Sequence, residues 1–244
     1  MASQTQRTSS DLASHLDVPI PAARADGETQ CDGLPSGTIV GSVQGSVPRD
    51  SILTEEWGAD AISEDQQWVI DPLDSTSYIS RHIAHAEGTL AHVASILHPI
   101  QNGTFTPTRG SGAQQEDAFL HVSDQQNLEG SFLSVGSTKH TYGREATPQL
   151  VPAFFHATRN IRMTGPAALD LTDVAAGQLD AIEYPELSGW AVAAGVLRIE
   201  EAVCRCTGYC DNTLAQASPT VEVATGAHHD ASFKFVEEGC HERS

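Results

Sequence analysis

The stretch WVIDPLDST, residues 68–76, places two aspartates around a proline directly after an apolar run. Its first three residues favour a β-strand, and an Asp-Pro pair commonly opens a turn. A strand followed by a turn explains the first carboxylate, Asp71, but gives no reason for the second, Asp74. The second carboxylate therefore marks this stretch as a candidate functional site.

A second predicted strand also delivers acids at its C-terminal end. The segment SILTEE, residues 51–56, reads as a short strand that ends in Glu55 and Glu56. The strand Gln67–Ile70 likewise runs into acids. Two strands that each present carboxylates at their C-terminal ends predict one shared site.

The charge balance of the chain limits the classes of partner that it can bind. The chain has 32 acidic and 13 basic residues, for a net charge of -19, and Lys139 and Lys234 are its two lysines against eleven arginines. A surface that reads phosphates needs clustered Lys and Arg, so we expect no nucleic-acid partner. An acidic, lysine-poor surface is typical where high salt screens self-repulsion, and this predicts a halophilic source.

Length and hydropathy indicate a globular chain. With 244 residues and 39% hydrophobic content it can form one large domain or two small ones. No stretch approaches the roughly 20 apolar residues that cross a bilayer, and the N-terminus lacks the features of a signal peptide. We therefore expect a cytoplasmic protein with no membrane partner. Residues 1–26 read as a poorly determined arm, and residues 27–244 as one domain.

Five cysteines are an odd number in a chain with no export signal, so a disulfide framework is not expected. Three of them form the segment CRCTGYC, which could hold a metal ion with a fourth ligand. The spacing lacks paired CxxC knuckles, and small buried or half-exposed thiols are the alternative. The candidate ligands are Cys204, Cys206, Cys210 and either Cys240 or His241.

Residues 77–100 predict further strands with an unusually polar pattern. Nothing in the spacing places His82, His85 and His92 on one face, so a solvated face or histidines satisfied within the core is favoured over a metal site. Residues 38–47 have sparse apolar residues, and residues 101–115 read as turns.

Two helices are predicted in the second half of the chain. Thr164–Gly177 has apolar residues at helical spacing, and Gly177 is a plausible C-terminal stop. Val192–Val203 is the second helix. Strand signals in the first half and alternating helix and strand in the second half indicate an α/β or α+β domain.

Four stretches taken together resemble the inositol monophosphatase family, Mg²⁺-dependent sugar phosphatases that include fructose bisphosphatases and nucleotide phosphatases. They are TQCD at 29–32, ILTEE at 52–56, WVIDPLDST at 68–76, and the run from Arg162 to Ala202. The first is similar to the family's T-x-x-D. The third is close to its W-I-D-P-[IL]-D-G-T and is a fairly specific signature. Order and spacing fit over roughly residues 27–240.

The resemblance implies a layered αβαβα sandwich, commonly a homodimer, that hydrolyses phosphate monoesters with Mg²⁺. Glu55, Asp71 and the carbonyl of Leu73 would hold the first ion, and Asp71 and Asp74 would hold the second. Such a cluster can activate a water and steady the leaving oxygen, where the transition state gathers negative charge. The implied substrate is a small phosphorylated metabolite, such as an inositol phosphate or fructose 1,6-bisphosphate.

The resemblance also assigns the remaining site residues. Thr76 would orient the nucleophilic water with Glu55, and Asp32 would support it from behind. Backbone N–H groups of Ser75 and Thr76, at a helix start, would receive the phosphate. The substrate-binding set is completed by Gly165 and Ala167.

One departure from the family pattern affects the metal site. Ala191 follows Trp190 where the family has an aspartate that completes the second metal site. A methyl group cannot bind a metal, so metal affinity and turnover should fall unless Asp180, Glu183 or Glu186 substitutes. The leading hypothesis is a metal-dependent phosphatase, and the alternative is a weakened or inactive pseudo-phosphatase with a binding or regulatory role.

Overall fold

The structure is a computed structural model of the 244-residue chain. It describes residues 36–48, 50–54, 58–59, 67–71, 81–87, 90–98, 103–115, 118–137, 141–185, 187, 189–202, 205–207, 221–224 and 229. The predicted N-terminal arm over residues 1–26 lies outside the described residues. The same holds for Cys31, Cys204, Cys210 and Cys240.

The first half of the chain forms an eight-stranded sheet, here sheet A, in the order β2-β1-β3-β4-β5-β6-β7-β8. β1 and β3 run parallel, and the other neighbouring pairs are antiparallel. The strands are β1 (Ser51–Thr54), β2 (Gly58–Ala59), β3 (Gln67–Asp71), β4 (Arg81–Glu87), β5 (Leu90–His98), β6 (Gly103–Phe105), β7 (Gln114–Gln115) and β8 (Ala118–Phe119).

The second half forms a five-stranded sheet, here sheet B, in the order β10-β9-β11-β13-β12. β10, β9 and β11 are parallel, and β13 and β12 are antiparallel to their neighbours. The strands are β9 (Phe132–Val135), β10 (Asn160–Arg162), β11 (Ala181–Tyr184), β12 (Arg205–Thr207) and β13 (Val221–Ala224), and a 3-10 turn, η1 (Leu128–Gly130), precedes β9.

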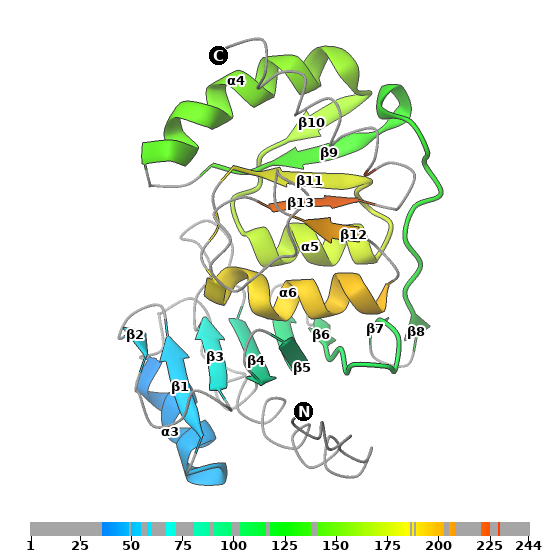
Figure 1. The fold of residues 1–244 in the computed structure, drawn as a ribbon. Helices are drawn as coiled ribbons and strands as arrows, with labels where there is room; N and C mark the ends of the chain where they lie inside the picture. The colour runs from blue at the N-terminus through cyan, green and yellow to red at the C-terminus, as the bar shows by residue number, and fades with distance from the viewer. Residues whose placement is uncertain are drawn as a thin grey trace, which may run out of the picture.

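Helices separate and cover the two sheets (Figure 1). α3 packs on the outer face of sheet A, α5 and α6 lie between the sheets, and α4 covers sheet B. The helices are α3 (Ser36–Ser46), α4 (Thr141–Ala157), α5 (Ala167–Ala175) and α6 (Gly189–Glu201). The layers therefore follow the expected αβαβα order. Among the described residues, no helix combines the length and the apolar character that a bilayer crossing requires.

β3 is buried on both faces of sheet A, because its side chains alternate between a face covered by α3 and a face covered by α6. Trp68 and Ile70 of β3 face α3, whereas Val69 packs with Leu197 of α6. This two-sided burial explains why the β3 sequence is a continuous apolar run.

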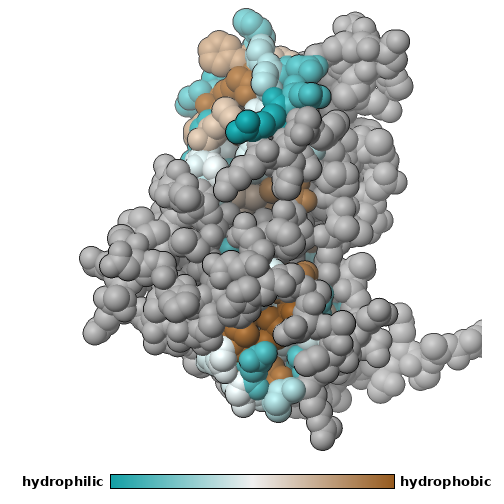
Figure 2. All heavy atoms as spheres, turned by 90° about the vertical axis from the view of Figure 1, so that its left-hand side faces the viewer, coloured by the Kyte–Doolittle hydropathy of each residue, from teal (hydrophilic) through white to brown (hydrophobic). Residues whose placement is uncertain are grey.

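Figure 2 shows the molecule from the side at which these layers end. At the lower end of that view, brown hydrophobic residues lie next to teal hydrophilic residues.

α3 is an element that the sequence analysis missed. Its apolar side chains are few, but Ile39, Val40 and Val43 all lie on the face that packs against sheet A. Gly41 and Gly45 lower the intrinsic helix propensity of this segment. Tertiary packing on Trp68 therefore stabilises a helix that propensity alone does not predict.

Several other elements were predicted, whereas α4 and the strands of sheet B were not located from the sequence. Strands 51–56 and 67–70 are β1 and β3, the strands of residues 77–100 are β4 and β5, and the two helices are α5 and α6. Gly177, with φ 68°, ends α5 as expected. The prediction of turns over residues 101–115 was wrong in part, since β6 and β7 lie there and pair in register with neighbouring strands.

Arg198 is a fully buried cation on α6. Its Nη1 donates to Thr172 Oγ1 at 3.1 Å, and its guanidinium lies 3.7 Å from the centre of the Phe105 ring. Burial lowers the pKa of Arg198 to about 9, against the opposing charge of Asp173, so the group remains protonated at pH 7. Its Nε and Nη2 have no hydrogen-bond partner among the described residues. A buried charge with two such nitrogens costs stability.

We expect Arg198→Met to raise the free energy of unfolding by about 1–3 kcal/mol, because it removes the desolvation cost of the charge and keeps most of the volume. Arg198→Ala should instead lower it by about 2–5 kcal/mol through the cavity it leaves. Urea unfolding of the two variants measures both effects. A loss in Arg198→Met as large as in Arg198→Ala would show that the guanidinium contacts outweigh the burial cost.

Candidate functional site

Asp71 is the last residue of β3, and its side chain is only 2% exposed. β1 runs parallel to β3, with Thr54 opposite Ile70. The two strands therefore end side by side at the same edge of sheet A, and the residue that follows Thr54 in the chain is Glu55. The register agrees with the expectation that both acid-bearing strands end at one place.

Most of the predicted catalytic and metal-binding residues lie outside the described residues. They are Asp32, Glu55, Leu73, Asp74, Ser75 and Thr76. Within the part that the structure describes, no group of three or more His, Cys, Asp and Glu side chains could hold a metal ion. The two-ion cluster thus stays a prediction, of which the structure describes Asp71.

His82 lies next to Asp71. The two are direct register partners on the antiparallel strands β4 and β3, and His82 Nδ1 lies 3.9 Å from Asp71 Oδ2. Burial lowers the pKa of His82 to about 3, so the imidazole is neutral at pH 7. The contact therefore joins a neutral ring to a carboxylate and is not an ion pair at that pH.

His85 is also buried but belongs to a different cluster. Its ring lies 4.9 Å from that of Trp68, and its Nε2 lies 3.8 Å from Asp50 Oδ2. Trp68 Nε1 donates to the same carboxylate at 2.9 Å. Both histidines thus lie in the core, while the half-buried His92 lies 3.7 Å from a carboxylate oxygen of the exposed Glu87.

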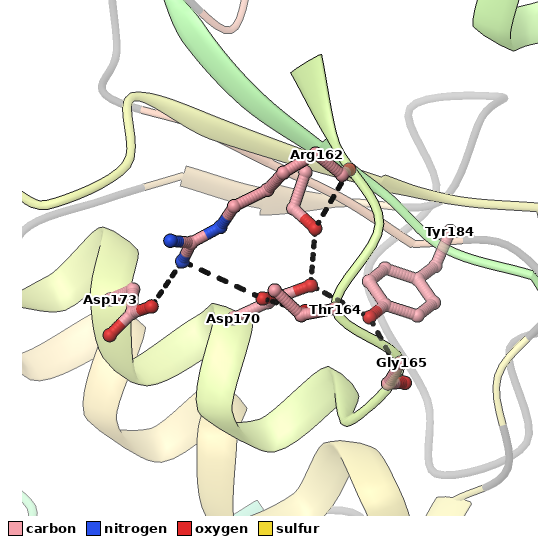
Figure 3. Close-up of polar contacts among 7 residues, drawn as sticks. Arg162, Thr164, Gly165, Asp170, Asp173 and Tyr184 are labelled. Carbon is pink, nitrogen blue, oxygen red and sulfur yellow. Dashed lines mark hydrogen bonds and ion pairs between the residues drawn. The ribbon is translucent and has the colours of Figure 1, made fainter. Parts of the chain in front are cut away.

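The second part of the candidate site is the loop between β10 and α5, which contains Gly165 and leads into Ala167 (Figure 3). Gly165 has φ 107°, a conformation that a side chain would strain. β9, β10 and β11 are parallel, so their C-terminal ends meet at one edge of sheet B, and α5 and α6 follow two of those strands in the chain. This is the edge at which ligands commonly bind in α/β folds.

Asp170, in the first turn of α5, fixes this loop. Its fully buried carboxylate accepts hydrogen bonds from Thr164 Oγ1 at 2.5 Å, from the Tyr184 hydroxyl at 2.8 Å, and from Ser134 Oγ. The Tyr184 hydroxyl also lies 3.4 Å from the carbonyl oxygen of Gly165. Figure 3 shows Thr164 of the loop and Tyr184 of β11 directed toward the Asp170 carboxylate.

The charge of Asp170 is only partly compensated. Burial raises the pKa of Asp170 above its ordinary value, and the three hydroxyl donors and the charge of Arg162 act in the opposite direction. Arg162 Nη2 is 3.8 Å from Asp170 Oδ1 and makes a closer ion pair with Asp173. Arg162 therefore draws both acids of α5 toward the end of β10.

Ala191 lies near the start of α6, the third residue of the helix. α6 packs on β3, β4 and β5, so the helix with the altered position covers the face of sheet A to which Val69 points. Alanine offers no ligand atom there. The predicted substitutes Asp180 and Glu183 have other surroundings: Asp180 accepts from the Phe132 backbone N–H at 2.6 Å, and Glu183 is fully buried in β11. Glu186 lies outside the described residues.

Two residues of this region were not identified as functional from the sequence. His82 was noticed, but its pairing with Asp71 depends on the β3–β4 register, which the polar pattern of residues 77–100 did not reveal. Asp170 lies within the predicted helix 164–177 but was not singled out, and its partners come from three other segments. The one available signal was an acid within the otherwise apolar run AALDL.

Known proteins resemble this chain over most of its length. The inositol monophosphatase family model matches residues 7–238. The Nus factor SuhB of Escherichia coli (strain K12) is 35% identical over 183 residues, which cover 71% of this chain and 68% of the relative. A solved inositol monophosphatase from Anabaena is 29% identical, with a TM-score of 0.85 over 93% of this chain and 97% of that chain. The Thermotoga maritima IMPase is 25% identical, with a TM-score of 0.77 over 95% and 98%. With the sequence motifs, the five-layer fold and the three comparisons in agreement, the chain belongs to the inositol monophosphatase family.

Proposed function

We propose that the protein is a metal-dependent hydrolase of small phosphate monoesters, with an inositol phosphate or a sugar phosphate such as fructose 1,6-bisphosphate as substrate. The observation that carries this proposal is the buried Asp71 carboxylate at the end of β3, beside the parallel end of β1, in a chain of this family. Family membership supports phosphatase chemistry, and the residues at this edge supply the acids that the chemistry needs.

The donor chemistry of Asp71 fits a divalent cation. Asp71 is a buried carboxylate, and carboxylate oxygens are the ligands that Mg²⁺ prefers. Asp71 would hold Mg²⁺ together with Glu55, the Leu73 carbonyl and Asp74. The bound ions would supply an activated water and charge stabilisation at the leaving oxygen.

Side chains and backbone groups of the chain would orient the attacking water and bind the substrate. Thr76 and Glu55 would orient the attacking water, with Asp32 behind them, and the backbone N–H groups of Ser75 and Thr76 would receive the phosphate. The Gly165–Ala167 segment would contact the remainder of the substrate. Asp170 supports this role because it holds Thr164 in place.

The test is phosphate release from inositol 1-phosphate, fructose 1,6-bisphosphate and adenosine 3',5'-bisphosphate, compared in the wild type and in Ala191→Asp. We expect turnover in the wild type on at least one substrate, and faster turnover in Ala191→Asp, by about 10- to 100-fold, because a metal ligand is regained. Unchanged turnover in Ala191→Asp, with turnover in the wild type, would mean that another group already fills this ligand position.

A second candidate function is a binding or regulatory role without turnover. Two observations favour it: Ala191 provides no ligand, and the curated relatives carry the name Nus factor SuhB. In that case the wild type releases no phosphate from any substrate, and release is seen only in Ala191→Asp.

Three further expectations belong to this proposal. The acidic composition favours a halophilic source, and assays at low and high salt test it through stability. The family resemblance favours a homodimer, which sedimentation would reveal. We also keep the expectation of a cytoplasmic protein that binds no nucleic acid.

A further inference from the structure

Asp71 and His82 point to the same face of sheet A, and His85 points to the other. Val69 of β3 and Ala84 of β4 pack against α6, while Ile83 packs with α3. Since side chains alternate along a strand, Asp71 shares the face of Val69, and His82 shares that of Ala84. His82 therefore lies on the α6 side of the sheet, where Asp71 ends β3.

The separation of the two groups suits ligands of a single ion. Two atoms that each bind a metal at about 2.1 Å lie no more than about 4.2 Å apart. His82 Nδ1 and Asp71 Oδ2 are 3.9 Å apart, and the side chains are 1% and 2% exposed. The ring already lies within reach of an ion bound to this carboxylate.

The chemistry of the ring differs from that of the other expected ligands. A neutral imidazole carries a lone pair on one ring nitrogen and can therefore bind a metal. Magnesium prefers oxygen ligands, whereas imidazole suits first-row transition metals such as Zn²⁺, Fe²⁺ and Ni²⁺. A nitrogen donor beside Asp71 would therefore change which metal the site binds best.

We propose that His82 is a nitrogen ligand in the metal site of Asp71, and that this site prefers transition-metal dications to Mg²⁺. The proposal rests on the proposed function, because it takes Asp71 to be a metal ligand. It also offers a donor atom in a site where Ala191 offers none.

The test uses Mn²⁺ as the probe and electron spin-echo spectroscopy as the readout, with no substrate and no turnover. In the wild type we expect ¹⁴N modulation from a directly bound imidazole, changed to a ¹⁵N pattern when the histidines are ¹⁵N-labelled. His82→Phe should remove the nitrogen signal and weaken Mn²⁺ binding by at least about 10-fold, with a smaller effect on Mg²⁺. His85→Phe is the matched control, since it removes a buried histidine of the same strand that lies by Trp68, and its nitrogen signal should persist.

The outcomes separate the two proposals. Mn²⁺ bound in an Asp71-dependent manner without nitrogen modulation overturns the role of His82 and leaves the proposed function intact. Absence of Mn²⁺ and Mg²⁺ binding in the wild type, or binding that Asp71→Asn does not weaken, overturns both. Where His82→Phe fails to fold, a wild-type spectrum without nitrogen modulation still overturns the role of His82.

Discussion

Asp71→Asn is expected to lower kcat/KM for phosphate release by about 10³-fold, because it removes the charge that holds the metal ions against the developing negative charge of the transition state. The side chain keeps its shape, so the buried end of β3 should still pack. Asparagine also removes a buried negative charge, and the free energy of unfolding without metal should therefore not fall. Steady-state kinetics and urea unfolding measure the two expectations.

Glu87→Gln is the matched control for this variant. Glu87 is an exposed carboxylate on the neighbouring strand β4, and its removal changes the net charge by the same amount. It should leave kcat/KM nearly unchanged. Equal losses in the two variants would attribute the effect to overall charge, and unchanged activity in Asp71→Asn would place the metal site elsewhere.

The second large effect is expected at Asp170, where Asp170→Ala should lower the free energy of unfolding by about 3–5 kcal/mol. It takes this acceptor from the hydroxyls of Ser134 and Tyr184 in a buried place, while Arg162 keeps its closer ion pair with Asp173. Asp170→Asn keeps one carbonyl acceptor and should cost less. Chemical unfolding of both variants gives the values. If the two changes cost the same small amount, the carboxylate does not organise this region.

The raised pKa of Asp170 also predicts the direction in which the stability of the protein changes with pH. Its pKa is raised in the folded state above 3.8, so over the interval just above pH 3.8 the folded state holds a proton that the unfolded state has lost. The stability of the wild type relative to Asp170→Asn should therefore fall as the pH rises through this interval, and level off above the raised pKa. A difference that stays constant or rises with pH would show that the carboxylate is not disfavoured by burial.

Much of the fold could be predicted because local pattern and tertiary packing agree. The β-branched and aromatic run ending at Ile70 forms a strand buried on both faces, and Gly177 stops α5 where a left-handed residue is needed. α3 could not be predicted from its own sequence, since its stability depends on contacts with Trp68. The short strands β6 and β7 depend on partners across sheet A in the same way.

The candidate site shows the same difference between local sequence patterns and contacts between distant segments. Acids at the ends of two neighbouring parallel strands are a local pattern, and Asp71 was found from it. The position of His82 depends on a register that is set across the sheet, and the partners of Asp170 come from β9, β11 and a loop. Such contacts between distant segments leave no spacing in the sequence by which they could be recognised.

The measurement that tests the central claim most directly is hydrolysis of inositol 1-phosphate, fructose 1,6-bisphosphate and adenosine 3',5'-bisphosphate by chelator-treated protein while a divalent metal is titrated back. We predict no phosphate release in the chelator and a saturable return of activity with metal, which Asp71→Asn fails to show. Phosphate release that continues in the chelator, or none at any metal concentration in any divalent metal, would contradict the account.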